Sequence, residues 1–381
     1  MKIRRAKAKE LLAAKNQAIR LAAALFLLVI AAISLLVSTQ DLKPFLLLVD
    51  ESAPAIPVRA VTSDSKVPSQ HPPLHCPTLL EDVLQNRSSI QDPNKGQVFS
   101  RWTDLPPSFQ IALHTRDFDP PRWSIMEWGH YYETALMNAF SVVLNETKRS
   151  PDNMPRVVDV GGNIGFFSLL AAAHGKVIVD TFEPNLANAF RMCQSVQLNG
   201  WVNEFDSSAT ISHKSSRVNC HAYGVGKELG SLFLAESWNP GQGKLSDTAK
   251  KGKEIPVITL DAFAESRGWF DSRPDIAILK VDVEGYEINV FQGGRRLLNS
   301  GMIRNIFMEV SARNQEEIRE SSACLGLIAS AGYDVYQYGG FRGPKHIVNW
   351  SGQNVTQLTD LVIHEVTKKK HPQLNLWFKL R

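Results

Sequence analysis

Residues 157–170 have the sequence VVDVGGNIGFFSLL, in which an apolar strand, a glycine-rich turn and an apolar helix follow one another. Gly161, Gly162 and Gly165 allow the backbone to approach a ligand closely and to adopt positive φ angles. In open α/β sheets, a turn of this kind at the carboxyl end of the first strand holds a nucleotide-like ligand. The stretch therefore predicts an α/β sheet with a ligand bound at this turn.

Strands and helices alternate on both sides of this turn, and the compact domain should begin near Trp123. Alternation of this kind predicts a mostly parallel sheet with helices on both faces. The segment from residue 126 leads into a predicted helix with an apolar stripe at residues 135–143, and a hairpin-like pair is predicted at 231–235 and 255–259. The predicted strands are 157–160, 176–182, 218–224, 276–281, 303–310, 333–338, 361–365 and 374–378. The predicted helices are 166–173, 186–198, 261–266, 287–298 and 315–331.

Two acidic residues indicate which ligand the turn holds. Asp159 ends the first predicted strand, where a carboxylate repels a pyrophosphate but suits the ammonium and sulfonium groups of S-adenosylmethionine; a purely structural role is the alternative. Glu183 ends the second strand, eighteen residues after Gly165, close to the spacing of about 20 at which an acid accepts hydrogen bonds from ribose hydroxyls. A surface carboxylate is the alternative for Glu183. Pro184 and Asn185 suit the start of the following helix.

A second acidic segment, KVDVEGYE at residues 280–287, follows the apolar strand 276–281. Asp282 and Glu284 should lie at the carboxyl edge of the sheet, where they could take a proton from an acceptor hydroxyl, orient it, or hold a divalent metal. Alternatively, Glu284 and Glu287 favour the dipole of the next helix. Glu309, at the end of another strand, points to the same edge. Alternatively, it is a structural partner of the basic side chain of Arg313 or Lys280.

The order of these pieces resembles the FkbM-family methyltransferases, a branch of the class I S-adenosylmethionine-dependent enzymes. The resemblance spans about residues 123–340 and implies a Rossmann-like, seven-stranded sheet and methylation of a hydroxyl, often on a sugar or a polyketide-derived product. The matching pieces are Tyr132-Glu133, VVDVGGNIGFFSLLAA (157–172), FEPN (182–185), AYGVGKELG (222–230), ITLDAF (258–263) and ILKVDVEGYEINVFQGG (278–294).

The resemblance also implies roles for single residues. Glu183 would hold the ribose, and Asp282 and Glu284 would lie near the acceptor as the catalytic pair, without a dedicated metal site. The family commonly has alanine where this chain has Gly162, a departure that we expect to be harmless. The methionine part of the donor would face Asp159, Gly161, Asn163 and Gly165, and the full set of candidate cofactor-binding residues adds Gly162, Glu183, Pro184 and Asn185.

An uncharged apolar run of seventeen residues, LAAALFLLVIAAISLLV at 21–37, predicts a transmembrane signal anchor. It is slightly short of the about 20 residues of a typical span, but longer than the apolar part of a cleaved signal peptide, which is the main alternative. A buried helix of a soluble domain is a weaker alternative. The basic flank at residues 1–20 predicts a type II orientation with the catalytic domain in the lumen of the Golgi or the endoplasmic reticulum.

Charge and composition support this plan. Residues 1–20 hold seven of the 42 basic side chains and one of the 38 acidic ones, so the remainder has a formal charge of −2. This argues against a nucleic acid as the main partner. We expect a cytosolic basic tail (1–20), the anchor (21–38), a Pro- and Ser-rich flexible stem (39–77), an N-terminal cap or extension (78–122) and an FkbM-like methyltransferase domain (123–381).

Four Asn-x-Ser/Thr acceptor sites modestly favour the secretory pathway, at Asn86, Asn145, Asn349 and Asn354. The four cysteines, Cys76, Cys193, Cys220 and Cys324, allow three full pairings, and their spacing resembles no zinc site. Free buried thiols are at least as good an interpretation as disulfides for the two cysteines in helix-like runs, Cys193 and Cys324.

The sequence therefore supports a main functional hypothesis and two alternatives. The main one is an S-adenosylmethionine-dependent O-methyltransferase whose acceptor is a glycan or another small molecule of the secretory pathway. The first alternative is a non-catalytic, membrane-anchored trafficking or scaffold protein with the same fold. The second is a type II glycosyltransferase that uses the DxD sequence at Asp117 and Asp119, although no apolar strand precedes it.

Overall fold

We analysed a computed structural model of the chain. It describes residues 76, 99–114, 125–126, 129–131, 133–149, 154–202, 216–234, 245–246, 252–311, 314–337, 348–349 and 373–381. All of these belong to the unit Pro68–Arg381, and the unit Met1–Val67 lies outside them. The predicted anchor, most of the predicted stem and the DxD sequence also fall outside the described residues. Within the described residues, no helix has the length and apolar character needed to span a membrane.

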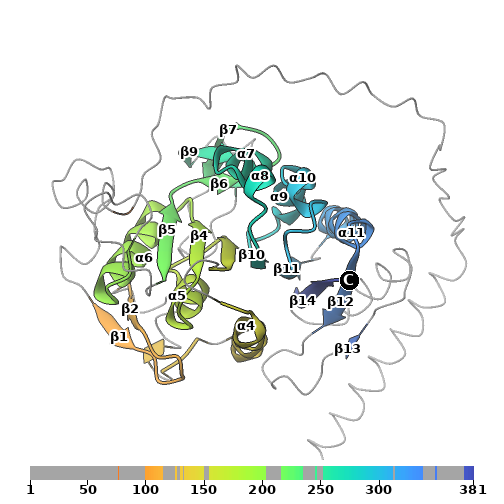
Figure 1. The fold of residues 1–381 in the computed structure, drawn as a ribbon. Coiled ribbons are helices and arrows are strands. Elements are labelled where there is room, and N and C mark those ends of the chain that lie inside the picture. Colours follow the sequence, from red (N-terminus) through yellow and green to blue (C-terminus); the bar gives the residue numbers. More distant parts are fainter. Residues whose placement is uncertain are drawn as a thin grey trace, which may run out of the picture. The chain divides into compact units, whose positions relative to one another are not determined.

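The main sheet has the strand order β13-β12-β14-β11-β10-β3-β4-β5 (Figure 1). Neighbouring strands from β5 to β11 are parallel, and β14 runs antiparallel to both of its neighbours. Seven strands form the predicted α/β sheet, and the two-residue strand β13 extends its edge. The bounds are β3 Arg156–Val160, β4 Ile178–Phe182, β5 Arg217–His221, β10 Ile276–Val281, β11 Asn305–Ser311, β12 Tyr333–Gln337, β13 Val348–Asn349 and β14 Gln373–Leu380.

Helices cover both faces of this sheet. Successive side chains along a strand point to opposite faces, so neighbouring residues of one strand belong to different buried clusters. Val157 belongs to one buried cluster, with residues of α4, α5 and α6, whereas Val158 belongs to the other, with residues of α7 to α11. Phe307 and Ile306 divide in the same way on β11. The helices are α4 Thr134–Glu146, α5 Phe166–Ala173, α6 Leu186–Leu198, α7 Leu260–Ser266, α8 Trp269–Ser272, α9 Glu287–Gln292, α10 Arg295–Leu298 and α11 Gln315–Ser330.

Two predicted elements were wrong in their extent. The helix predicted at 287–298 is broken into α9 and α10, because the backbone at Gly293 packs against Gly226, whose carbonyl oxygen would lie 2.0 Å from an added Cβ. The strand predicted at 218–224 ends at His221. The chain then enters a second sheet of order β6-β9-β7-β8, which contains the predicted hairpin pair. Its strands are β6 Gly224–Val225, β7 Gly230–Leu234, β8 Leu245–Ser246 and β9 Lys253–Ile258.

A short antiparallel hairpin, β1 Ser100–Trp102 with β2 Gln110–Ala112, is attached to helix α6. The backbone N–H of Ala112 donates to the Ser195 hydroxyl over 2.8 Å. The Asn199 side chain accepts from the Gln110 N–H over 2.8 Å and donates to the Gln110 carbonyl over 2.6 Å. Residues before the predicted start at Trp123 are therefore hydrogen-bonded to the sheet's helical cover.

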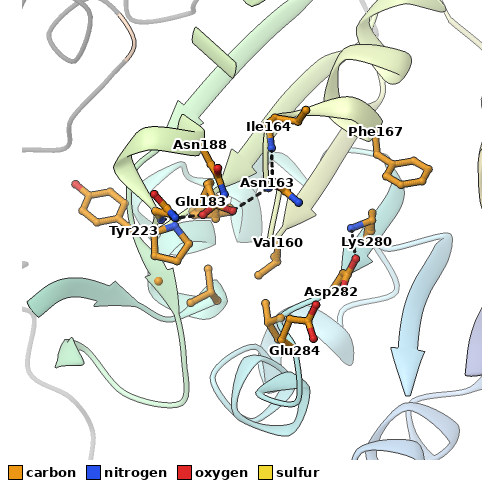
Figure 2. Close-up of a pocket in the computed structure, with 18 of the residues that line it drawn as sticks. Val160, Asn163, Ile164, Phe167, Glu183, Asn188, Tyr223, Lys280, Asp282 and Glu284 are labelled. Atoms are coloured by element: carbon orange, nitrogen blue, oxygen red, sulfur yellow. Dashed lines mark hydrogen bonds and ion pairs between the residues drawn. The ribbon is translucent and has the colours of Figure 1, made fainter. Parts of the chain in front are cut away.

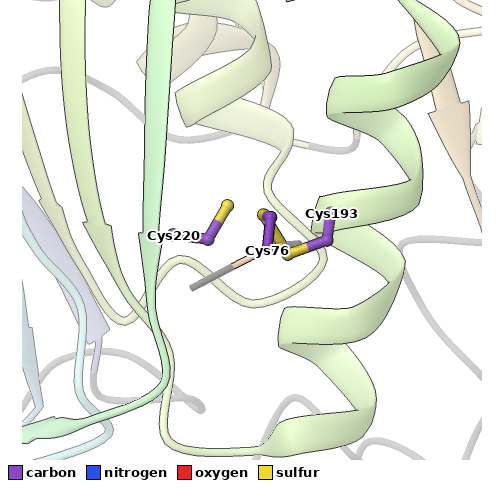
Figure 3. A group of neighbouring side chains, drawn as sticks. All are labelled: Cys76, Cys193 and Cys220. Atoms are coloured by element: carbon purple, nitrogen blue, oxygen red, sulfur yellow. A yellow bond between two sulfur atoms is a disulfide. The ribbon is translucent and has the colours of Figure 1, made fainter. Parts of the chain in front are cut away.

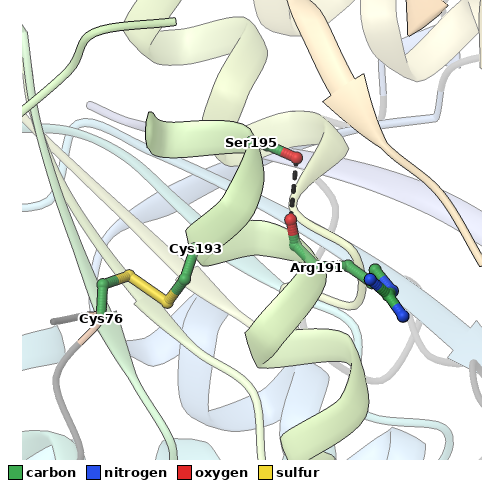
Figure 4. The surroundings of a disulfide bond; sticks show 4 residues. All are labelled: Cys76, Arg191, Cys193 and Ser195. Atoms are coloured by element: carbon green, nitrogen blue, oxygen red, sulfur yellow. Dashed lines mark hydrogen bonds between the residues drawn. A yellow bond between two sulfur atoms is a disulfide. The ribbon is translucent and has the colours of Figure 1, made fainter. Parts of the chain in front are cut away.

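A disulfide joins Cys76 to Cys193 on helix α6, 117 residues apart in sequence (Figure 4). This settles the alternatives that the sequence left open for Cys193, whereas Cys324 is a free buried thiol. The free thiol of Cys220 lies next to the disulfide, and the three sulfur atoms are within 4.8 Å of one another (Figure 3). Burial raises the pKa of the Cys220 thiol, which keeps it protonated and slow to exchange.

Candidate functional site

A cleft of about 890 Å³, open solvent included, lies at the carboxyl ends of β3, β4 and β10 (Figure 2). The second sheet contributes to its wall through β6 and β7. Ligands of open α/β sheets bind at this edge, outside the carboxyl ends of the strands. The cleft brings together eight of the ten predicted site residues: Gly161, Gly162, Asn163, Glu183, Pro184, Asn185, Asp282 and Glu284.

The glycine turn after β3 is shaped by backbone contacts. Gly161 has a φ of +83°, and a Cβ there would lie 1.8 Å from the carbonyl oxygen of Asp282. The Asp282 N–H in turn donates to the Val160 carbonyl over 3.0 Å. Gly165 has a φ of +94° and faces Met192 of α6, whose Cγ would lie 2.5 Å from a Cβ. Gly161 therefore lets the turn touch the end of β10, and Gly165 lets α5 and α6 pack closely.

At Gly162 the restriction comes from neighbouring side chains. A Cβ at this position would lie 2.3 Å from the Thr181 hydroxyl oxygen and 3.0 Å from the Met192 methyl carbon. Thr181 is fully buried on β4, and its hydroxyl has no hydrogen-bond partner among the described residues. Glycine at 162 is thus matched to threonine at 181, and replacing it by the alanine common in the resembling family would not be neutral in this chain.

Glu183 ties the glycine turn to the start of α6. Its Oε2 accepts from the Asn163 N–H and its Oε1 from the Asn185 N–H, both over 2.8 Å. Asn163 has a φ of +52°, and its side chain accepts from the Ile164 N–H (Figure 2). Burial raises the pKa of Glu183 to about 7, against the opposing effect of these hydrogen bonds. The Asn188 side chain is also hydrogen-bonded to this carboxylate, so three of the about four acceptor sites of a carboxylate are occupied.

Asp159 and Gly165 do not line the cleft. The Asp159 side chain is 1% exposed, and its Oδ2 accepts from the Ser168 hydroxyl over 2.7 Å. Its Oδ1 lies 3.6 Å from the Lys280 ammonium. The carboxylate predicted to face a cationic ligand is therefore placed beneath the turn and already paired with a cation of the chain, which supports the structural alternative.

Asp282 and Glu284 project from the loop after β10 at the opposite side of the cleft from Glu183 (Figure 2). Asp282 Oδ2 lies 3.1 Å from Lys280 Nζ, and its side chain is 31% exposed. Glu284 has a φ of +56°, an uncommon conformation for a residue with a side chain. Glu287 Oε1 accepts from the Gly285 N–H over 3.0 Å at the start of α9, which favours the structural alternative for Glu287.

Further acidic groups belong to this side of the cleft. Burial and the nearby Asp282 carboxylate raise the pKa of both Glu133 and Glu309. Glu133 precedes α4 and is hydrogen-bonded to the side chain of Asn375 on β14. From the sequence, Glu133 was noted only as part of the Tyr132-Glu133 motif and was not predicted as a site residue. Its place beside Asp282 depends on the packing of α4 and β14, which no local spacing reveals.

The histidine and tyrosines before α4, and the asparagines of the predicted glycosylation sites, differ in their position relative to the cleft. Tyr131 lines the cleft and stacks on Phe166 with 4.6 Å between ring centroids. His130 does not line it, and Tyr132 is outside the described residues. Asn145 lies exposed in the last turn of α4, and Asn349 lies in β13, whereas the other two acceptor asparagines fall outside the described part of the chain.

Solved structures with a similar arrangement include a SAM-dependent methyltransferase from Agrobacterium tumefaciens, with 10% sequence identity, a TM-score of 0.32, and coverage of 77% of this chain and 72% of that chain. Another is precorrin-6y C5,15-methyltransferase from Geobacter metallireducens, with 10% identity, a TM-score of 0.28, and coverage of 64% and 89%. A third is a putative SAM-dependent methyltransferase from Streptococcus mutans, with 11% identity, a TM-score of 0.34, and coverage of 77% and 57%. A comparison with curated protein sequences found no match.

The family comparison concerns the sheet and the cleft directly. Residues 159–335 match the model of the methyltransferase FkbM domain. This range begins at the end of β3 and includes the glycine turn, Glu183, and the loop with Asp282 and Glu284. The chain therefore carries an FkbM methyltransferase domain and is an S-adenosylmethionine-dependent methyltransferase.

Proposed function

We propose that this enzyme is an O-methyltransferase that methylates a hydroxyl of a glycan or of another acceptor in the secretory pathway. The observation that carries the proposal is the cleft itself, which places Glu183 at one side and the carboxylates of Asp282 and Glu284 at the other. If Glu183 holds the donor, the loop with Asp282 and Glu284 remains available to bind the acceptor.

The residues on the donor side fit S-adenosylmethionine. The Glu183 carboxylate lines the cleft and can accept a hydrogen bond from a ribose hydroxyl, and the glycine turn offers close backbone approach without phosphate-binding cations. Among the described residues that line the cleft, Lys280 is the only lysine or arginine, so a pyrophosphate ligand would meet mostly carboxylates. Asn163, Pro184 and Asn185 complete the wall on this side.

On the acceptor side, Asp282 would take the hydroxyl proton. The donor supplies a methyl group on a sulfonium: as the acceptor oxygen forms the new C–O bond, the C–S bond breaks with its electron pair on sulfur, and the hydroxyl proton moves to Asp282. Glu284 lies beside Asp282 and would orient the hydroxyl. General-base catalysis of this kind contributes about 10²- to 10⁴-fold to the rate.

The compartment supports a glycan as the acceptor. The apolar run at residues 21–37 with its basic flank, together with four acceptor sites for N-glycosylation, is the reason to propose a type II membrane protein whose cleft faces the lumen of the Golgi or the endoplasmic reticulum. Glycans carry many neutral hydroxyls in that space. A lipid or a secreted small molecule is the next acceptor class.

The test uses the full-length chain, because Cys76 is joined to α6. Glycans from cells with and without the protein are compared by mass spectrometry for the loss of a 14-dalton increment, the mass of one added CH₂, and the Asp282→Asn variant is expressed in the deficient cells. We expect the variant to bind S-adenosylmethionine in calorimetry but not to restore the increment. Unchanged glycans in the deficient cells would remove this acceptor class, and full restoration by Asp282→Asn would remove Asp282 from the mechanism.

A further inference from the structure

Lys280 is a charged residue in the middle of the sheet. It lies on β10, whose other residues are all apolar, and only 4% of its surface is exposed. A buried ammonium is costly unless opposite charges and hydrogen bonds compensate it. The strand register explains how this compensation arises, because Lys280 lies directly opposite Asp159 on β3.

The contacts of the Lys280 ammonium link the two sides of the cleft. Its Nζ lies 3.1 Å from Asp282 Oδ2 on the acceptor side (Figure 2). It also lies 3.6 Å from Asp159 Oδ1 beneath the glycine turn. The same atom lies 5.2 Å from the centre of the Phe167 ring, on a third element. Burial lowers the pKa of Lys280, but Asp282 and Asp159 raise it more, so the group carries its charge at neutral pH.

Apart from Lys280, the described titratable groups around Asp282 are acidic. Burial raises the pKa values of Glu133, Glu287 and Glu309, and the Asp282 carboxylate raises them further. Without a cation, a further ionised carboxylate at position 282 would be disfavoured by its neighbours. The acidic groups that face this pair are Asp159 from β3, Glu284 from the loop after β10, Glu287 from α9, Glu309 from β11 and Glu133 before α4.

We propose that Lys280 is a positioning residue for methyl transfer: its ammonium holds the Asp282 carboxylate toward the cleft and balances its charge among the neighbouring acids, so that Asp282 can take the acceptor proton. The inference rests on the proposed function, since it assigns Lys280 a role in deprotonating the acceptor hydroxyl. In this role Lys280 acts through Asp282 and keeps its own proton throughout. Lys280 is hydrogen-bonded to Oδ2 of Asp282, and within the described part of the chain the other oxygen is left for the hydroxyl.

The test compares the full-length wild-type chain with Lys280→Met, which removes the charge but keeps the apolar stem, and with Lys280→Arg, which keeps the charge. Lys379→Met, at an exposed site on β14, controls for the loss of a lysine. Transfer of labelled methyl from S-adenosylmethionine to a pool of glycans released from secreted glycoproteins is measured from pH 5 to 9. Binding of S-adenosylmethionine is measured by calorimetry on the same samples.

We expect Lys280→Met to lower turnover at pH 7 at least about tenfold and to move the acidic limb of the pH–rate profile upward by about 1–3 pH units, with donor affinity kept within about threefold. Lys280→Arg should keep the wild-type limb, and Lys379→Met should resemble the wild type. If Lys280→Met does not fold, Lys280→Gln, which keeps a hydrogen-bond donor without the charge, must show the same upward shift.

Two results would overturn the inference while the proposed function stands. One is an unshifted acidic limb in the uncharged variants. The other is a loss of donor affinity that accounts for the whole loss of turnover, which would mean that Lys280 pairs with the carboxylate of S-adenosylmethionine. A wild-type chain that binds the donor but methylates nothing in the pool overturns the proposed acceptor, and the role of Lys280 falls with it.

Discussion

Replacing Gly162 by alanine should destabilise the protein through one contact. The new Cβ would lie 2.3 Å from the Thr181 hydroxyl oxygen, although the next atom of that side chain, Cβ, is 3.7 Å away. Overpacking of this size in a buried place costs about 1–3 kcal/mol. Thr181→Ala alone loses a buried methyl group, worth about 1 kcal/mol, but no hydrogen bond, because no described residue is hydrogen-bonded to the hydroxyl. In the double variant the alanine methyl occupies the space that the hydroxyl leaves.

The assay is thermal unfolding of the four proteins of this double-mutant cycle. At about 2–4 °C per kcal/mol, Gly162→Ala should lower Tm by about 2–12 °C, and the double variant should unfold within about 2 °C of Thr181→Ala. Thr181→Val is the matched control, since it keeps a methyl group where the hydroxyl was and should not rescue Gly162→Ala. Additive losses in the Thr181→Ala cycle, or rescue by valine, would refute the contact as the cause.

Three further predictions concern the donor and the framework. Because the pKa of Glu183 is raised to about 7, and the ionised form accepts hydrogen bonds from ribose, the Kd for S-adenosylmethionine in calorimetry should rise about tenfold per pH unit as the pH falls below 7; a flat profile from pH 8 to 5.5 would contradict this role. For the same reason, this group stabilises the unliganded fold below pH 4.5 and that stability is lost as the pH rises through 7, so Tm without donor should fall across this window and addition of donor should oppose the fall. Replacing Cys76 and Cys193 by serine opens a loop of 117 residues and should lower the free energy of unfolding by about 2–5 kcal/mol. A reductant should produce the same loss of Tm in the wild type. The control is Cys324→Ser, which breaks no disulfide, and an equal loss of Tm in this variant would contradict the expectation.

The sequence predicted those parts of the fold and site that local spacing determines. Strand, turn and helix at residues 157–170 follow from apolar runs and glycines, and the place of Glu183 follows from its distance along the chain to the turn. Helix α5 and helix α6 have the predicted bounds. These are properties of consecutive residues, and tertiary packing only had to be consistent with them.

The parts that it missed depend on contacts between distant segments. Asp159 was assigned to the ligand because an unpaired carboxylate suits a cation, but the strand register supplies Lys280 as its partner. The helix at 287–298 is broken because Gly293 meets another backbone. The disulfide of Cys193 could not be assigned because Cys76 lies in a region without a local pattern.

The place of β14 in the sheet has a consequence for the order of folding. Strand β12 follows α11 in the chain, yet it pairs with β14 and not with β11. Until β14 arrives, β11 is an unprotected edge, and among the described strands β12 has only the two-residue strand β13 to pair with, a state that is open to pairing with another chain.

The same strand carries Asn375, which is hydrogen-bonded to Glu133 next to Asp282. Insertion of β14 therefore completes the sheet and the acceptor side of the cleft in a single late event. A chain caught before that event would hold a finished glycine turn and an unfinished acidic loop, so the ability to recognise the donor should mature earlier during folding than the ability to use it.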